Sequence, residues 1–273
     1  MYYLETNSVR ILSKKLHLPF YLKNCYTSLL TVCELLAGIK DEITFKQRKG
    51  IVRIIYSSRI LCDNDLPETK RYKSYGITIN NKTNEGIMLL GVLCITSTTY
   101  SELKREIAKN NLSEYWEFLK IYDNVDGRFK ESYRKRQDTF DYSDPEMIND
   151  FKKRWDYLKD DPELKKNTLN DLIVYYAKTL LTDSVIDIGK RSLQDLISNY
   201  DHSIDIYFLC TGYFTGTKLI FKNAPSRNDY IDIAHLMYLR NPDDKIITND
   251  KMLIKMMKKL FLDNIMTTDD FQK

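Results

Sequence analysis

Two short apolar segments at opposite ends of the chain are each followed closely by an acidic residue. Residues 2–4 (Tyr-Tyr-Leu) lead into Glu5, and residues 245–248 (Lys-Ile-Ile-Thr) lead through Asn249 to Asp250. Aromatic and β-branched runs of this length, bounded by polar residues, predict short strands. In open parallel sheets, ligands bind beyond the carboxyl ends of the strands. We therefore expect both acids to face one crevice, although they come from opposite ends of the chain.

The composition predicts a folded protein and leaves its partner open. The chain has 273 residues, of which 43% are hydrophobic and 29% charged. These fractions are typical of globular proteins and argue against disorder over the chain as a whole. The 42 lysines and arginines exceed the 38 acids by only four, so the total charge does not identify a nucleic-acid-binding protein. Local clusters of charge are more informative than the total.

The cysteines and the apolar stretches predict a cytoplasmic protein without a membrane partner. The five cysteines are Cys25, Cys33, Cys62, Cys94 and Cys210. No two have C-x-x-C spacing and their number is odd, which argues against a zinc ribbon and against a disulfide framework. No signal-peptide pattern is present at the N-terminus. The longest apolar stretch, residues 86–95, is far shorter than the roughly 20 residues that a membrane span requires.

Strand-like and helical segments divide the chain into two parts. Residues 1–65 and 205–273 combine short strands with helices, whereas residues 66–204 have mainly helical patterns. The helices expected in the first part span residues 9–16, 46–57, 229–239 and 252–262, and Ser8 is expected to cap the first of them. The chain is therefore predicted to be an α/β protein with a large helical insertion or lid at residues 66–204.

Further acids are placed on two of the predicted helices. Glu34 lies at the start of an apolar helix that follows a strand-like segment. Asp229 and Asp232 are three residues apart and so share one helix face, which His235 continues one turn later. Carboxylates gathered without cationic partners raise one another's pKa, and such a cluster is stable mainly when it binds hard cations. Mg²⁺ and Mn²⁺ prefer oxygen ligands. Two such ions about 4 Å apart cleave phosphodiester bonds by activating water and stabilising the leaving oxygen.

Each acid also has an ordinary structural explanation. Glu5 and Asp250 are both placed to cap the helices that follow them. Glu34 is explained equally well as a solvent-facing helix residue, and Asp232 as a first-turn acid that complements the helix dipole. The functional interpretation therefore rests on the combination of the four, and not on any one of them.

Four segments of the sequence resemble the PIN-domain ribonucleases. Residues 3–8 (Tyr-Leu-Glu-Thr-Asn-Ser) match a strand that ends in an acid, and residues 27–35 match a strand leading into a helix with Glu-Leu. Residues 232–236 (Asp-Ile-Ala-His-Leu) match an acid that opens an apolar helix, and residues 246–250 match a strand ending in Thr-x-Asp. The last two matches, with their acids eighteen positions apart, are the most specific part of the resemblance.

The resemblance implies a fold and an activity for less than half of the chain. It implies a three-layer α/β/α core with a parallel sheet of four or five strands, and Mg²⁺ or Mn²⁺ bound by Glu5, Glu34, Asp232 and Asp250. The implied activity is endoribonuclease cleavage of RNA, with DNA as a possible second substrate. Two features depart from the family pattern. Glu5 replaces the usual aspartate, which puts metal geometry and rate in doubt, and the insertion at residues 66–204 is not explained by the pattern.

Several neighbouring residues are candidates for supporting roles. Asp229 is a candidate fifth metal ligand. Thr6, Asn7, Thr248 and Asn249 are candidates to hydrogen-bond the carboxylates or the substrate phosphate. His235 has two explanations: it orients a ligand or contacts a phosphate, or it is a half-buried helix residue with a local hydrogen bond. The second explanation is the more common one for such a histidine.

Two groups of basic residues are candidates for binding the RNA backbone. The first group lies in the helix predicted at residues 46–57 and comprises Lys46, Arg48, Lys49 and Arg53. The second lies in the insertion, has Phe129 and Tyr133 among its members, and comprises the basic residues Arg128, Lys130, Arg134, Lys135 and Arg136. For either group the ordinary alternative is a solvated helix face. The second group is the better RNA candidate because it mixes charge with aromatic side chains.

The sequence leaves two further functional alternatives open. The first is a catalytically weak or inactive PIN-like module that binds RNA or a protein partner, or a second copy of itself, through the insertion. The second is a purely structural helical protein. Motifs of other enzyme classes are missing, since the chain has no G-x-S-x-G elbow, no Walker-type glycine loop and no H-E-x-x-H. A metal-dependent endoribonuclease with two divalent ions is the leading hypothesis.

Overall fold

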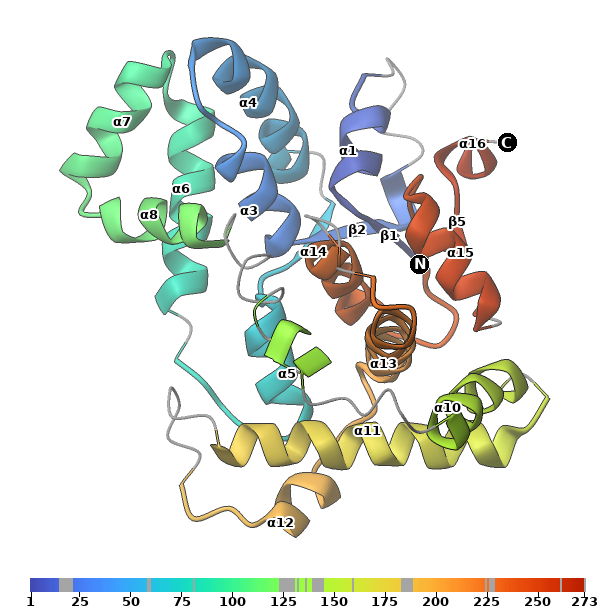
Figure 1. The fold of residues 1–273 in the computed structure, drawn as a ribbon. Coiled ribbons are helices and arrows are strands. Elements are labelled where there is room, and N and C mark those ends of the chain that lie inside the picture. The colour runs from blue at the N-terminus through green and yellow to red at the C-terminus, as the bar shows by residue number, and fades with distance from the viewer. Residues whose placement is uncertain are drawn as a thin grey trace.

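A five-stranded, entirely parallel sheet forms the centre of the computed structural model (Figure 1). Its strands are β1 (Tyr2–Leu4), β2 (Cys25–Ser28), β3 (Leu61–Asp63), β4 (Lys245–Ile247) and β5 (Ile265–Met266), in the spatial order β3-β2-β1-β4-β5. The first strand of the chain is therefore the central one. It pairs with β2 on one side and with β4 on the other, so the two ends of the chain meet in the sheet. This confirms the predicted α/β class and the parallel sheet.

The structure describes most of the chain. The described residues are 1–14, 22–57, 60–80, 82–122, 131, 133–135, 137–138, 145–158, 160–182, 189–223, 225, 229–260 and 262–272.

The helices that connect the first three strands lie close to their predicted positions. They are α1 (Thr6–Leu12), the 3₁₀ turn η1 (Leu22–Asn24), α3 (Leu29–Ala37) and α4 (Glu42–Ser57). The predicted cap of α1 was wrong. Glu5 caps this helix, because its carboxylate accepts hydrogen bonds from the backbone N–H groups of Asn7 and Ser8. Ser8 lies inside the helix, where its hydroxyl donates to the Ile247 carbonyl oxygen at 2.5 Å.

The described part of residues 66–204 is helical, as the sequence pattern predicts. Its helices are α5 (Pro67–Ser74), α6 (Lys82–Thr96), α7 (Tyr100–Lys109), α8 (Ser113–Tyr122), α10 (Pro145–Tyr157), α11 (Pro162–Thr182) and α12 (Leu193–Ser198). Proline stands at the first position of α5, α10 and α11, where its missing N–H costs no helical hydrogen bond. None of the helices that the structure describes is long and apolar enough to cross a membrane.

The C-terminal part returns to the sheet. Its elements are α13 (Asp205–Ile220), α14 (Asp229–Ala234), the 3₁₀ turn η2 (His235–Tyr238), α15 (Lys251–Lys259) and α16 (Thr268–Phe271), with β4 and β5 between them. The single helix expected at residues 229–239 is in fact a short α-helix that tightens into a 3₁₀ turn at His235. The five cysteines all lie in the described part of the chain, where none forms a disulfide and all but Cys62 are buried.

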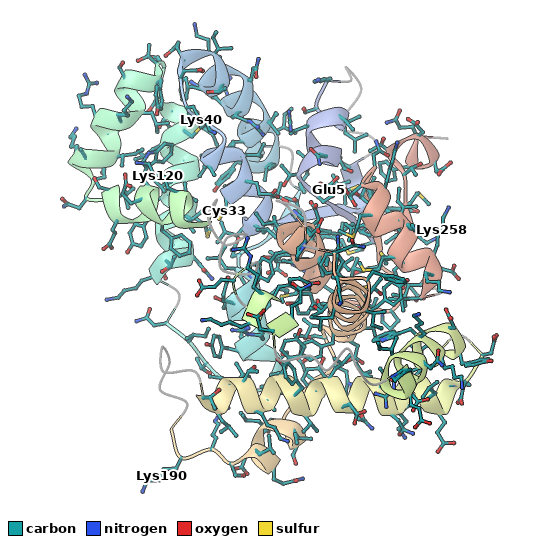
Figure 2. The ribbon with its side chains drawn as sticks, in the orientation of Figure 1. Glu5, Cys33, Lys40, Lys120, Lys190 and Lys258 are labelled. Carbon is teal, nitrogen blue, oxygen red and sulfur yellow. The ribbon has the colours of Figure 1, made fainter. Side chains whose placement is uncertain are left out.

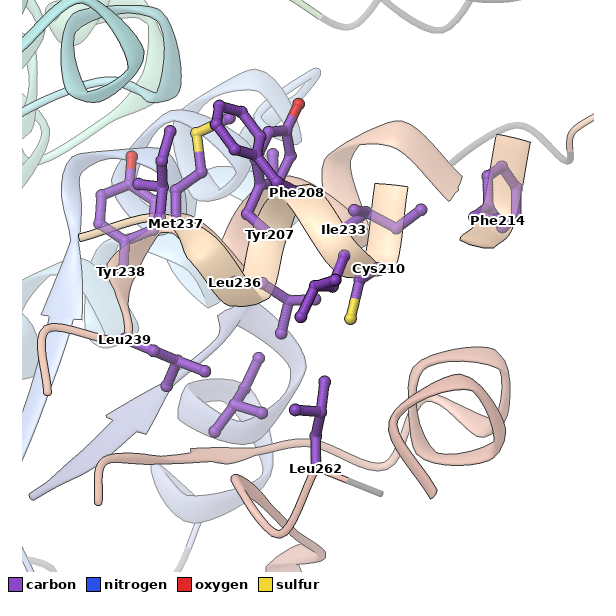
Figure 3. Close-up of a cluster of buried hydrophobic side chains, with 14 of the residues drawn as sticks. Tyr207, Phe208, Cys210, Phe214, Ile233, Leu236, Met237, Tyr238, Leu239 and Leu262 are labelled. Carbon is purple, nitrogen blue, oxygen red and sulfur yellow. The ribbon is translucent and has the colours of Figure 1, made fainter. Parts of the chain in front are cut away.

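Two hydrophobic clusters cover the two faces of the sheet. Side chains alternate along each strand, so Tyr3 and Ile246 belong to one cluster whereas Leu4 and Ile247 belong to the other. The first cluster is built with α11, α13, α14, η2 and α15, and Figure 3 shows α13 side chains such as Phe208 beside Leu236 and Met237. The second is built with α1, α3, α4, α6, α7 and α8. Helices of residues 66–204 therefore pack into both clusters and share the interior of the sheet domain.

Candidate functional site

The carboxyl ends of three neighbouring strands bring the predicted acids to one edge of the sheet. Leu4 pairs with Ile247, so Glu5 and the turn that carries Asp250 leave adjacent strand ends. Strand β2 runs directly into α3, which carries Glu34, and α14 carries Asp232. Figure 2 labels Glu5 beside α1 and Cys33, the neighbour of Glu34, on α3.

Glu5 is buried and held in a fixed position. One carboxylate oxygen accepts a hydrogen bond from the Asn7 N–H at 2.7 Å. The other accepts from the Ser8 N–H at 3.1 Å and from the Ser8 hydroxyl at 3.2 Å. Burial raises the pKa of Glu5, while His235 and the Asn7 N–H oppose that shift. The structural explanation of Glu5 as a helix cap is therefore correct, and both of its oxygens are already used.

Glu34 is the outer end of a chain of hydrogen bonds that runs into the core. Its Oε2 accepts from the Thr6 hydroxyl and lies 2.8 Å from His235 Nε2. His235 is 1% exposed, and its Nδ1 lies 2.6 Å from the Tyr3 hydroxyl, which lies 2.7 Å from Ser28 Oγ. Burial alone lowers the pKa of His235, but Glu34 reverses the sign and leaves it raised. His235 is therefore an ion-pair partner that fixes the orientation of Glu34.

The pKa of Asp232 is shifted by burial and by the other acids of the site. Its pKa is raised from the ordinary value of 3.8 to about 7, first by burial and then by the charge of Asp250. Glu34 and Glu5 raise this pKa further, and His235 alone among the main contributors lowers it. Burial by itself raises the pKa of a carboxyl group, and nearby carboxylates raise it further. The four predicted acids therefore lie close enough for their charges to influence Asp232.

Asp250 begins the helix that follows its strand. Its Oδ1 accepts from the Leu253 N–H at 2.7 Å, so Asp250 is the N-cap of α15. The buried Thr248 supports this turn, since its hydroxyl accepts from the Asp250 N–H at 3.0 Å. The structural explanation of Asp250 is thus correct as well, but a capping role uses only one of its two oxygens.

The carboxylates differ in how many of their oxygens are free of hydrogen bonds and able to coordinate a metal ion. Within the described residues, Glu34 Oε1, Asp250 Oδ2 and both oxygens of Asp232 accept no hydrogen bond. These are hard anionic donors of the kind that Mg²⁺ and Mn²⁺ take. No group of three His, Cys, Asp or Glu side chains in the described part of the chain lies close enough to hold a metal ion as it stands. The donor chemistry suits a hard cation, and the side chains must move toward one another to bind it.

Three of the predicted supporting residues have other partners. Asp229 is buried next to Lys218, whose Nζ lies 3.7 Å from Asp229 Oδ2. Asn249 is turned toward α16, where its amide exchanges two hydrogen bonds with Thr268. Asn7 is exposed, and its side-chain oxygen accepts from Arg10 Nη1 at 3.4 Å.

The predicted RNA-binding residues fall into four situations. Lys49 Nζ donates to the Ser97 carbonyl oxygen and lies over the Phe45 ring, so Lys49 holds α4 to its neighbours. Arg134 and Lys135 are exposed, and Lys135 pairs with Glu131 at 3.1 Å. Arg136 lies outside the described residues. Arg48 belongs to α4, and its guanidinium lies against Gly38 at the C-terminal end of α3.

Two functional features were missed at the level of sequence. Tyr3 and Ser28 extend the Glu34–His235 pair into the core, but in the sequence they look like ordinary strand residues. Arg10 lies three positions after Asn7, a helical spacing that was available as a signal.

Asp63, a buried acid at the end of β3, has two cationic partners. Lys70 Nζ lies 2.8 Å and Arg240 Nη2 3.2 Å from Asp63 Oδ2, so Asp63 forms structural ion pairs.

Comparison with protein-family models, with curated proteins and with solved structures found no match for this chain. The resemblance to PIN-domain ribonucleases therefore remains an expectation drawn from the four sequence segments.

Replacing Asp232 by asparagine is expected to stabilise the metal-free chain at alkaline pH. With a pKa of about 7 against 3.8, the folded state binds this proton more tightly than the unfolded state. The free energy of unfolding therefore falls as the pH rises from about 4 to about 7. Asparagine removes this loss, by about 2 kcal/mol at pH 8 once partial exposure is allowed for. Melting temperatures in EDTA should show a larger gain at pH 8 than at pH 5. The exposed Asp263→Asn should show no gain at either pH.

Proposed function

We propose that this chain is a metal-dependent nuclease that hydrolyses RNA phosphodiester bonds with two bound Mg²⁺ or Mn²⁺ ions. The observation that carries the proposal is the pairing of Leu4 with Ile247, which places Glu5 and the turn of Asp250 at adjacent strand ends. Burial first, and then the charge of Asp250, raises the pKa of Asp232 in the same group of acids. Four carboxylates at one sheet edge repel one another unless cations lie among them. The four segments that resemble PIN-domain ribonucleases support the same activity, as does a parallel sheet with the acids beyond its strand ends.

The residues of the site have separate roles in this proposal. Asp232, Asp250 and Glu34 have free oxygens and would hold the ions. His235 and Thr6 orient Glu34, and Glu5 adds negative charge from its fixed position at the start of α1. When bound, such ions supply an ionised water and neutralise charge on the leaving oxygen.

The test is whether Mn²⁺ both stabilises the chain and allows it to cleave RNA. Ligand binding to the folded state raises the melting temperature, by about 5 °C for a chain of this size when the ion is well above its dissociation constant. We expect this rise with Mn²⁺, and we expect labelled RNA to be cut in Mn²⁺ but not in EDTA. The double variant Asp232→Asn, Asp250→Asn should show neither effect. Wild-type protein that gains no stability and cuts no RNA would rule out the proposal.

A second candidate is a catalytically inactive module that binds RNA or a protein partner. Two observations favour it: both oxygens of Glu5 are used in capping α1, and the described acids form no ready-made metal cage. This candidate predicts that RNA binds equally well in Mn²⁺ and in EDTA and is recovered uncut.

A further inference from the structure

Arg48 occupies an unusual place at the end of the helix that carries Glu34. It projects from α4, and its guanidinium lies against the backbone of Gly38, the C-cap of α3. A Cβ built on Gly38 would lie 2.9 Å from Arg48 Nη2 and 3.0 Å from its Cζ. The φ angle of Gly38 is −77°, which any residue adopts, so a side chain here would contact Arg48 without straining the backbone. Because glycine has no side chain, the planar guanidinium of Arg48 lies directly against the backbone here.

Arg48 has no anionic partner in the described part of the chain. It is half-buried, yet no carboxylate lies within ion-pair distance of it and it donates no hydrogen bond there. Arg10, an exposed residue of α1, is the second basic group near it and is tied to Asn7. Burial and the charge of Arg10 lower the pKa of Arg48, and Glu34 opposes this shift. Two cations near each other, one without a partner, form a place where an anion lowers the free energy.

The two arginines belong to the helices that frame the acid site. Helix α1 begins at Glu5, helix α3 carries Glu34, and α3 packs against both α1 and α4. Figure 1 shows these three helices next to one another on the same face of the sheet, the face covered by the second hydrophobic cluster. Gly38, against which Arg48 lies, is four positions after Glu34, and Arg10 is five positions after Glu5 on α1. Each arginine therefore lies about one helical turn beyond one of the acids.

We propose that Arg48 and Arg10 form a phosphate-binding subsite, which holds a backbone phosphate of the nucleic acid next to the one presented to the acids. This inference rests on the proposed function. The planar guanidinium group suits it, because arginine binds phosphate oxygens through two parallel hydrogen bonds. The two lysines of α4 in the same basic group are less suitable. Lys46 pairs with Glu42 at 3.5 Å, and Lys49 donates to the Ser97 carbonyl.

The test measures binding separately from cleavage. The probe is a fluorescein-labelled oligouridine of about 12 nucleotides, a length that a single-strand groove covers. Anisotropy is read in EDTA, so that no cleavage occurs. Arg48→Ala is expected to weaken binding about tenfold. It should also reduce the slope of log affinity against log salt concentration by about 0.7, the contribution of one phosphate contact to a single strand. Arg48→Lys should recover part of the affinity, because it keeps the charge and loses the planar group.

Gly38→Ala is the sharper variant because it changes no charge. Its methyl group would contact the far end of the Arg48 side chain, which must shift to make room. We expect it to weaken binding measurably but less than Arg48→Ala does, while the melting temperature stays within a few degrees of wild type. The matched control is Lys109→Ala in α7, with 73% of its side chain exposed, which should bind the probe like wild type.

The outcomes separate this inference from the proposed function. If Arg48→Ala binds the probe as well as Lys109→Ala does, the subsite is wrong, even if the wild-type chain cuts RNA in Mn²⁺. If Arg48→Ala weakens binding and the wild-type chain cuts nothing in Mn²⁺, the subsite stands and the nuclease activity is wrong. A wild-type chain that does not bind the probe at all overturns the subsite directly.

Discussion

Asp250→Asn is expected to lower the rate of Mn²⁺-dependent RNA cleavage at least about 100-fold. Loss of a residue that only supports a metal ligand costs up to about 100-fold, and Asp250 is proposed to hold the ions directly. The fold should survive, because asparagine caps a helix as well as aspartate does and can still accept the Leu253 N–H. The free energy of unfolding should change by no more than about 1 kcal/mol. Cleavage rates and denaturant unfolding of the same preparations measure both effects.

The Asp250 variant also has a control and a second readout. Asp263→Asn removes an exposed acid close in sequence and should leave the cleavage rate unchanged. Since Asp250 is the charge that most raises the pKa of Asp232, its removal should move that pKa down toward the ordinary value. Titration of Asp232 by carboxyl-group NMR would detect the shift. A variant that cuts RNA at the wild-type rate would remove Asp250 from the mechanism.

His235→Ala is expected to destabilise the chain by about 3 kcal/mol, the usual cost of removing one partner of a buried ion pair. The substitution leaves Glu34 and the Tyr3 hydroxyl without the ring nitrogens that lie 2.8 Å and 2.6 Å from them. Because the pKa of His235 is raised in the folded state, its ion pair contributes fully below about pH 6.5 and is lost as the pH rises through the folded-state value. The deficit should therefore be largest near pH 6 and smaller near pH 9, as measured by denaturant unfolding.

His202 provides the matched control for His235. It also faces a carboxylate, Asp205, with 3.1 Å between Nδ1 and Oδ2, but 61% of its side chain is exposed. Exposed ion pairs contribute about 0–1 kcal/mol, so His202→Ala should change the free energy of unfolding by no more than that. Equal losses in the two variants would mean that burial adds nothing to the Glu34–His235 pair.

Local chemistry explains which features were predictable from the sequence. Strand and helix positions follow from apolar periodicity and from turn and capping residues within a few positions, and so β1, β4 and most helices were predicted close to where they lie. The positions of Glu5 and Asp250 directly after strands also predicted that they meet at one edge. That inference needed only the parallel sheet, because parallel strands place their carboxyl ends together.

Packing between distant segments explains the rest. The sequence left Glu5 as either a cap or a ligand, and only the structure shows both of its oxygens bound within α1. The choice of Lys218 as the partner of Asp229 depends on how α13 packs against α14. The sequence by itself determined an α/β chain with acids following its strands. The tertiary structure alone decided that His235 meets Glu34 across 201 positions and that Arg48 rests on Gly38, because such contacts depend on how whole helices pack and not on the residues beside them.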